Sequence, residues 1–289
     1  MNKSNELLFN SRAREMCFDN DFIYTSAAKD IFKWDINTKT LVSIKTIPPN
    51  DSMNKGVLLC LDENNIYFNS TYFFHVMDKK TNEILHQRQF GTNNSSDFDL
   101  GRILVDNNQV YFPMRNNGVV VVDKNNYDNF EYVKKDDGSI WALEQDENMI
   151  YMGGVEKTIF SINKSTLKTE AAFKGHKGNV HNIYSYKGYI VSTSADNSII
   201  IWNKSDGAIF HQLKNTDCSM GRAVMNENYL LCVAKKRIKV WDINTWNLVA
   251  NVKTFGRLFY SDDIIYIADR DVARIEAHKI DDIISIGEK

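Results

Sequence analysis

The sequence predicts an all-β protein built from seven similar units of four strands each. One observation is the alternation of apolar and polar residues with a period of two, as in residues 22–26 (FIYTS) and 237–241 (RIKVW). This alternation is typical of half-buried β-strands and excludes helical repeats of similar length. The other observation is a pattern that recurs along nearly the whole chain. Its equivalent third-strand positions, 36 to 45 residues apart, are Trp34, Met77, Val122, Ile162, Trp202, Trp241 and Ala277.

A single sheet of four strands cannot bury both of its faces, so we expect the units to stack as one seven-bladed β-propeller. The expected blades span residues 14–45, 56–90, 101–133, 140–174, 180–214, 221–253 and 256–279, and the domain covers all 289 residues. The segment 6–10 aligns with the outer strand of a blade, as 247–251 does, and is expected to close the seventh blade. The alternative is closure by the segment 283–286.

Composition and charge limit the partners. With 35 Lys and Arg against 37 Asp and Glu, the net charge is -2, so no global basic field exists to hold nucleic acid or an anionic membrane. No apolar run is long enough for a secretory signal or a membrane helix, and we expect a cytoplasmic or nuclear protein. The cysteines Cys17, Cys60, Cys218 and Cys232 form no CxxC pair, which favours reduced thiols over a zinc site or a disulfide framework.

Residues 175–203 (GHKGNVHNIYSYKGYIVSTSADNSIIIWN) carry a recognisable motif: Gly-His before the first strand, Asp196 in a tight turn and Trp202 in the third strand. Two further units end in Trp-Asp, at Trp34-Asp35 and Trp241-Asp242. With these residues the chain resembles the WD-repeat family of β-propellers. The resemblance implies a rigid interaction scaffold.

The resemblance also implies that four residues of the fifth unit form a structural hydrogen-bond chain: His176, Ser192, Asp196 and Trp202. A Ser/His/Asp set invites a hydrolase interpretation as well. We favour the structural role, because a nucleophilic serine must be exposed beside an oxyanion hole, whereas Ser192 falls in the middle of a strand.

Acidic clusters such as Asp62-Glu63-Asn64-Asn65 recur at the same strand-to-strand turn in six of the seven units. We attribute them to turn chemistry, in residues that tolerate a positive φ, and not to calcium binding. The sequence contains no calcium loop, phosphate-binding loop, zinc motif or nucleophile motif. We therefore expect no catalytic residue, no metal and no cofactor.

The opposite end of the units, called here the top face, is richer in basic residues. Gly-Arg opens the first strand of three units, at Arg102, Arg222 and Arg257, and Trp141 is placed at the matching position of the fourth. Top loops add Arg115, Lys157, Lys235, Lys236 and Arg270. Arginine offers a planar fork to carboxylate or phosphate, so these residues could bind an acidic or phosphorylated peptide. The alternative is that each arginine pairs with a carboxylate of a neighbouring unit, such as Glu15 or Asp99, and that Trp141 packs between units.

The leading hypothesis is a non-catalytic protein-interaction scaffold or adaptor that binds its partner at the top face, near the central channel. The alternative is a structural subunit that binds through the rim, where Trp246 is expected, or through the acidic bottom turns. An enzyme sited in the channel is a third hypothesis, with only Glu15, Glu144 and His181 as candidate groups. Aromatic residues alternate inside strands and do not follow a basic stripe, which argues against nucleic-acid binding.

Overall fold

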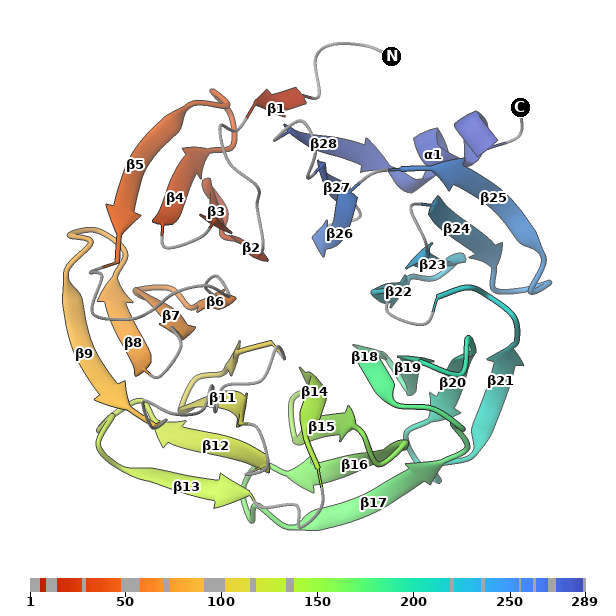
Figure 1. Ribbon diagram of the computed structural model, residues 1–289, viewed down its shortest axis with the longest axis horizontal. Coiled ribbons are helices and arrows are strands. Elements are labelled where there is room, and N and C mark those ends of the chain that lie inside the picture. The colour runs from red at the N-terminus through yellow and green to blue at the C-terminus, as the bar shows by residue number, and fades with distance from the viewer. Residues whose placement is uncertain are drawn as a thin grey trace. The chain divides into compact units, whose positions relative to one another are not determined.

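A computed structural model shows seven four-stranded antiparallel sheets and one short helix (Figure 1). The structure describes residues 6–8, 15–27, 30–47, 58–69, 73–90, 102–114, 118–133, 138–218, 221–234, 237–254, 256–261, 264–269 and 274–287. This strand content is that of a seven-bladed β-propeller, so the predicted fold class is confirmed.

The chain divides into two compact units. The unit of residues 9–140 holds three sheets, in which each strand pairs with the next along the chain. Their strands are β2 (Glu15–Phe18), β3 (Phe22–Ala27), β4 (Asp30–Asp35) and β5 (Leu41–Thr46); β6 (Leu58–Leu61), β7 (Asn65–Asn69), β8 (Phe73–Asp78) and β9 (Ile84–Gln89); and β10 (Leu104–Val105), β11 (Gln109–Met114), β12 (Gly118–Asp123) and β13 (Phe130–Val133).

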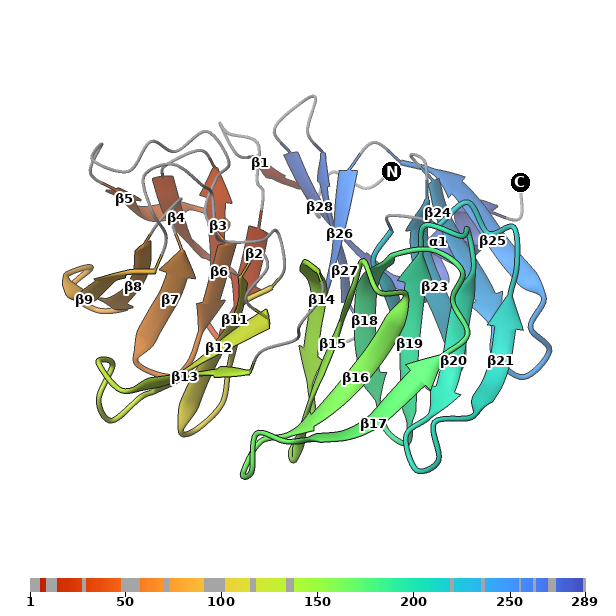
Figure 2. The same cartoon turned by 60° about the horizontal axis from the view of Figure 1, so that its bottom comes forward.

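The other unit holds four sheets, formed by residues 1–8 and 141–289, and Figure 2 shows their strands running in alternate directions. Their strands are β14 (Ile140–Gln145), β15 (Met149–Gly154), β16 (Thr158–Asn163) and β17 (Thr169–Lys174); β18 (Val180–Tyr186), β19 (Tyr189–Ser194), β20 (Ile199–Asn203) and β21 (Ile209–Leu213); β22 (Ala223–Met225), β23 (Tyr229–Ala234), β24 (Arg237–Asp242) and β25 (Leu248–Lys253); and β26 (Gly256–Ser261), β27 (Ile264–Asp269), β28 (Arg274–Lys279) and β1 (Glu6–Leu8).

The last sheet is completed by the N-terminal strand, because β1 pairs with β28 with Leu7 opposite Ile275. Phe9 and Asn10 lie outside the described residues. The segment 283–286, considered above as an alternative closing strand, belongs instead to the helix α1 (Ile280–Gly287). Asp282 accepts a hydrogen bond from the Lys279 N–H at 3.3 Å, which caps the helix start, and Ile280 and Ile283 are buried against β25.

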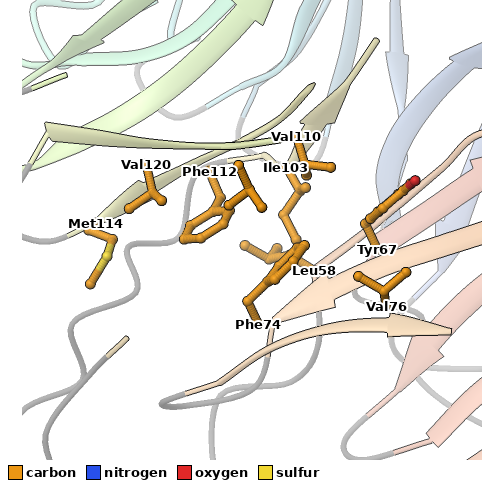
Figure 3. Packing of buried hydrophobic residues seen from close by; sticks show 10 residues of the cluster. Leu58, Tyr67, Phe74, Val76, Ile103, Val110, Phe112, Met114 and Val120 are labelled. Carbon is orange, nitrogen blue, oxygen red and sulfur yellow. The ribbon is translucent and has the colours of Figure 1, made fainter. Parts of the chain in front are cut away.

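Apolar side chains fill the space between neighbouring sheets. Figure 3 shows one such cluster, in which β7 and β8 contribute Tyr67, Phe74 and Val76 and the next sheet contributes Val110 and Phe112. The rings of Phe74 and Phe112 stack with their centroids 5.1 Å apart. A sheet buries its faces only through such contacts, which is why the repeat must be stacked to be stable.

The first turn of a sheet is organised by its aspartate. In the second sheet, one carboxylate oxygen of Asp62 accepts hydrogen bonds from the N–H groups of Asn64 (2.9 Å) and Asn65 (2.8 Å). Asp19, Asp106 and Asp146 make the same pair of bonds, and Asn226 makes them with its amide oxygen.

Our expectation of positive φ at these acidic turns is wrong. Among the described residues, several of the positive φ values in non-glycine residues lie in third-to-fourth strand turns, at Lys39, Asn82, Leu167 and Trp246. The acidic side chains are needed as acceptors for two N–H groups, and not for their tolerance of left-handed backbone.

Besides shaping the turn, these aspartates also contact a lysine of the next sheet. The second carboxylate oxygen of Asp62 accepts a hydrogen bond from the Tyr67 hydroxyl (2.7 Å) and pairs with Lys124 of the next sheet (2.6 Å). Asp146 repeats the arrangement with Tyr151 and Lys204, each at 2.8 Å, and Asp19 pairs with Lys79 at 2.6 Å. Burial alone would raise the pKa of Asp62, but the hydrogen bonds from Lys124 and the turn N–H groups lower it.

We expect the Lys204→Met substitution to destabilise the protein by about 1 to 2 kcal/mol, because it leaves the Asp146 carboxylate half-buried without its cation. The side chains of this pair are only 17% and 26% exposed. The measurement is the urea midpoint of unfolding at pH 7.

The matched control is Lys187→Met. Lys187 pairs with Glu227 at 2.6 Å, but these side chains are 61% and 73% exposed, so water replaces the lost contact. The control should leave the midpoint unchanged. An equal decrease in the urea midpoint of the two variants would contradict a stabilising role for the buried Asp–Lys ion pairs.

Candidate functional site

Four of the nine predicted top-face residues fall outside the described part of the chain: Arg115, Lys235, Lys236 and Arg270. Arg257 lies in β26, but its side chain is outside the described residues. Lys157 is exposed in the turn between β15 and β16, with a φ of 62°. Arg102, Arg222 and Trp141 remain to be placed. We call the end of a sheet at which its first strand begins the arginine end, and the opposite end the turn end.

The register of the first strands shows that Trp141 does not occupy the arginine position. Arg102 and Arg222 each lie four residues before the side chain that caps the first turn, Asp106 or Asn226. The residue four before Asp146 is Ala142, which is buried. The predicted placement of Trp141 is therefore wrong by one residue, and a shift of one residue turns a side chain to the other face of a sheet.

Trp141 packs between sheets. Its ring stacks on that of His181, the second residue of β18, with centroids 5.0 Å apart and planes at 26°. Burial lowers the pKa of His181, so the imidazole is neutral at pH 7. This is the packing alternative given above for Trp141.

The backbone on both sides of Arg222 is held by the preceding sheet. The Thr193 hydroxyl donates to the Gly221 carbonyl at 2.8 Å, and the Ala223 N–H donates to the Asn182 side chain at 3.0 Å. Gly221 itself is packed so closely that a Cβ there would lie 1.8 Å from the Val233 carbonyl oxygen. Arg222 is thus presented from a rigid segment.

The Arg222 side chain is half-buried, with its guanidinium carbon 4.9 Å from the centre of the Phe259 ring. This distance is that of a cation–π contact between the guanidinium and the ring. The first strands of two neighbouring sheets, β22 and β26, therefore meet at this side chain.

Arg102 has different surroundings. In the first sheet, the residue four positions before the turn aspartate is Glu15, and it is buried. The charges of Glu15 and Arg102 both affect the pKa of the Cys60 thiol. Burial raises the pKa of Cys60 to about 12, Arg102 opposes this shift and Glu15 adds to it. The arginine position thus carries charges of both signs in this unit of the chain, and we centre the candidate site on Arg222.

The structure brings together the four residues for which a hydrogen-bond chain was predicted. His176 Nδ1 lies 3.1 Å from a carboxylate oxygen of Asp196, and its Nε2 lies 2.8 Å from Ser192 Oγ. The Trp202 indole N–H donates to the same Ser192 oxygen at 2.8 Å. Ser198, which the sequence analysis missed, joins the network through its hydroxyl, 3.1 Å from His176 Nδ1 and 2.6 Å from Asp196.

The polar groups of this network are satisfied by one another. Ser192 is fully buried and its oxygen already bonds to His176 and Trp202, so no substrate carbonyl can approach it. Burial lowers the pKa of His176, although Asp196 partly opposes the shift. For Asp196, burial would raise the pKa, but hydrogen bonds from Ser198 and the Lys177 N–H lower it to about 2.

Comparisons with known proteins give a fold and no family. The sequence matches no protein-family model and no curated protein. It is similar in fold to the computationally designed Ika8 protein, whose crystal structure gives a TM-score of 0.66 at 18% identity over 96% of this chain and 100% of that one. At this identity the likeness shows the fold alone. Across the described residues, no helix has the length and apolar character needed to span a bilayer.

We expect His176→Gln to lower the stability at pH 7 by about 1 to 3 kcal/mol, because it leaves buried polar partners unsatisfied. It should also weaken the pH dependence. The folded pKa of His176 is lowered, so below pH 6.5 the unfolded chain binds a proton that the folded chain excludes, and stability falls as the pH falls.

Urea midpoints at pH 7, 6 and 5 test both parts of this prediction. The wild type should lose more stability than the variant between pH 7 and pH 5. Parallel pH profiles would show that His176 is not a buried neutral group.

Proposed function

We propose that this protein is a non-catalytic interaction scaffold that binds an acidic or phosphorylated segment of a protein partner at the arginine end of its sheets, with Arg222 as the principal contact. The resemblance to WD-repeat propellers supports a scaffold role. Fold alone does not establish function, so the proposal depends on the site.

The observation that carries the proposal is the fixed position of Arg222. Thr193 and Asn182 hold the backbone on either side of it, and Phe259 supports its guanidinium. A binding group whose backbone and side chain are already ordered loses little entropy on binding. Arginine presents a planar set of donors that matches carboxylate and phosphate oxygens. Arg257 opens the neighbouring first strand and is proposed as the second cation.

The non-catalytic part of the proposal is supported by the state of the one Ser/His/Asp set. Its serine is fully buried and its oxygen bonds to an imidazole and an indole, which is a structural arrangement. We propose no cofactor, no nucleic-acid partner and no membrane contact.

A rim site is the second candidate function, that of a structural subunit in a larger assembly. Phe210 is 51% exposed and Ile209 44% exposed on the outer strand β21. The Trp246 ring stacks on His211 with centroids 4.0 Å apart, beside Phe210. Exposed aromatic residues are common at protein interfaces. The turn end is a weaker candidate, because Asp62 and Asp146 are already paired with lysines.

The test is an immobilised library of phosphoserine and phosphothreonine peptides, each with its unphosphorylated counterpart, probed with the labelled protein. We expect the protein to select phosphorylated or acidic members, and Arg222→Glu to weaken binding at least about 10-fold, since a charge-assisted hydrogen bond contributes about 1.5 to 3 kcal/mol.

The matched control is Lys168→Glu, which changes the net charge equally at an exposed residue of the turn end. It should bind as the wild type does. Equal binding by Arg222→Glu and the wild type, with both folded, would exclude this site and favour the rim. Retained binding by Phe210→Ser would then contradict the rim as well.

A further inference from the structure

Two of the four cysteines lie together in the interior of the sheet β22–β25 and the turn that precedes it. Cys218 and Cys232 are both free thiols, both fully buried, and both members of one core cluster with Ala223, Met225 and Trp241. Each thiol shifts the pKa of the other. The function proposed above uses neither of them.

The turn before β22 directs Cys218 inward. Asn215 and Asp217 have positive φ values of 54° and 61°, a backbone conformation that Asn and Asp tolerate well. Thr216 is tied to the preceding sheet, because its N–H and its hydroxyl bond to the Asn197 carbonyl at 2.9 and 3.0 Å. Cys218 Sγ lies 3.5 Å from the Thr216 carbonyl oxygen, and its side chain belongs to the same core cluster as Cys232 of β23.

The surroundings of the two thiols differ in a way that suits a nucleophile and its resolving partner. The Cys232 thiol lowers the pKa of Cys218 more than burial raises it, and the Lys239 ammonium lowers it further against the opposing charge of Asp217. Burial and the Cys218 thiol raise the pKa of Cys232. The Lys239 ammonium is held in place by the Thr216 carbonyl at 2.8 Å and Asp217 at 3.3 Å.

We propose that Cys218 and Cys232 form a redox-active dithiol that hydrogen peroxide converts reversibly into an intramolecular disulfide. The Cys218 thiolate attacks one peroxide oxygen, the O–O bond breaks, and hydroxide leaves, so that Cys218 becomes a sulfenic acid. The Cys232 thiol then attacks the Cys218 sulfur, an S–S bond forms, and the hydroxyl leaves as water. In sum, two thiols and one peroxide give one disulfide and two water molecules.

Access to the buried thiols requires local opening. The segment from Asn215 to Cys218 is outside any strand, and segments of this kind open at a lower free-energy cost than the sheets themselves. Oxidation should therefore be slower than at an exposed thiol and proceed without global unfolding. The product would join the turn before Arg222 covalently to β23. The proposed redox reaction of the two cysteines does not depend on whether Arg222 binds a peptide.

The experiment treats the folded, full-length protein with hydrogen peroxide, alkylates the remaining thiols after denaturation, and maps the peptides by mass spectrometry. We expect a Cys218–Cys232 cross-linked peptide, lighter by about 2 Da than the two reduced peptides together, that dithiothreitol restores to thiols. Cys218→Ser and Cys232→Ser should each abolish the cross-linked peptide. In the Cys232→Ser variant, oxidation of Cys218 should end at the sulfenic acid, which a dimedone probe captures.

Circular dichroism and the urea midpoint of each variant establish that it is folded before oxidation. Recovery of both cysteines as alkylated thiols in the wild type would overturn the proposal. So would oxidation of Cys218 in the wild type to sulfinic acid without the cross-link, since it would show that Cys232 does not resolve the intermediate.

Discussion

A half-buried contact between the first-turn aspartate of one sheet and a lysine of the next sets the relative position of the sheets at Asp19–Lys79, Asp62–Lys124 and Asp146–Lys204. A sheet of four strands buries its faces only against its neighbours, and apolar contacts such as that between Phe74 and Phe112 do not by themselves fix how far one sheet slides along another. A lysine bonded both to Asp62 and to the Asp106 carbonyl of its own sheet fixes that position. The aspartate therefore shapes its turn and positions the next sheet at once.

The junction before β22 is built differently, and the candidate site lies there. The first turn of the sheet β18–β21 contains Lys187 and Gly188 in place of an aspartate. The ion pair between Lys187 and Glu227 is exposed. The buried polar contacts at this junction lie at the arginine end, where Asn182 and Thr193 bond to the backbone beside Arg222. The contacts that hold the two sheets together are thus the contacts that order the proposed binding residue.

Sequence reasoning predicted the fold because a period of two within strands and of about 40 residues between units survives wide variation in the individual residues. It failed where one residue decides the outcome. Trp141 was misplaced because it was aligned with the glycine of Gly-Arg: it lies five residues before its turn aspartate, as Gly101 does, whereas Arg102 lies four before Asp106. The Asp–Tyr–Lys ties were missed, although an aspartate five residues before a tyrosine recurs at Asp62, Asp106 and Asp146. Ser198 was missed because its role depends on a tight turn that no spacing rule describes.

Hydrogen–deuterium exchange, with and without a phosphopeptide selected from the library, tests most directly whether the arginine end is the working surface. The account predicts added protection in residues 221–225 and 256–260, around Arg222 and Phe259, and unchanged exchange in residues 209–213 and 244–248. Protection confined to the outer strand β21 and the turn of Trp246, with none around Arg222, would contradict the account and identify the rim as the binding surface.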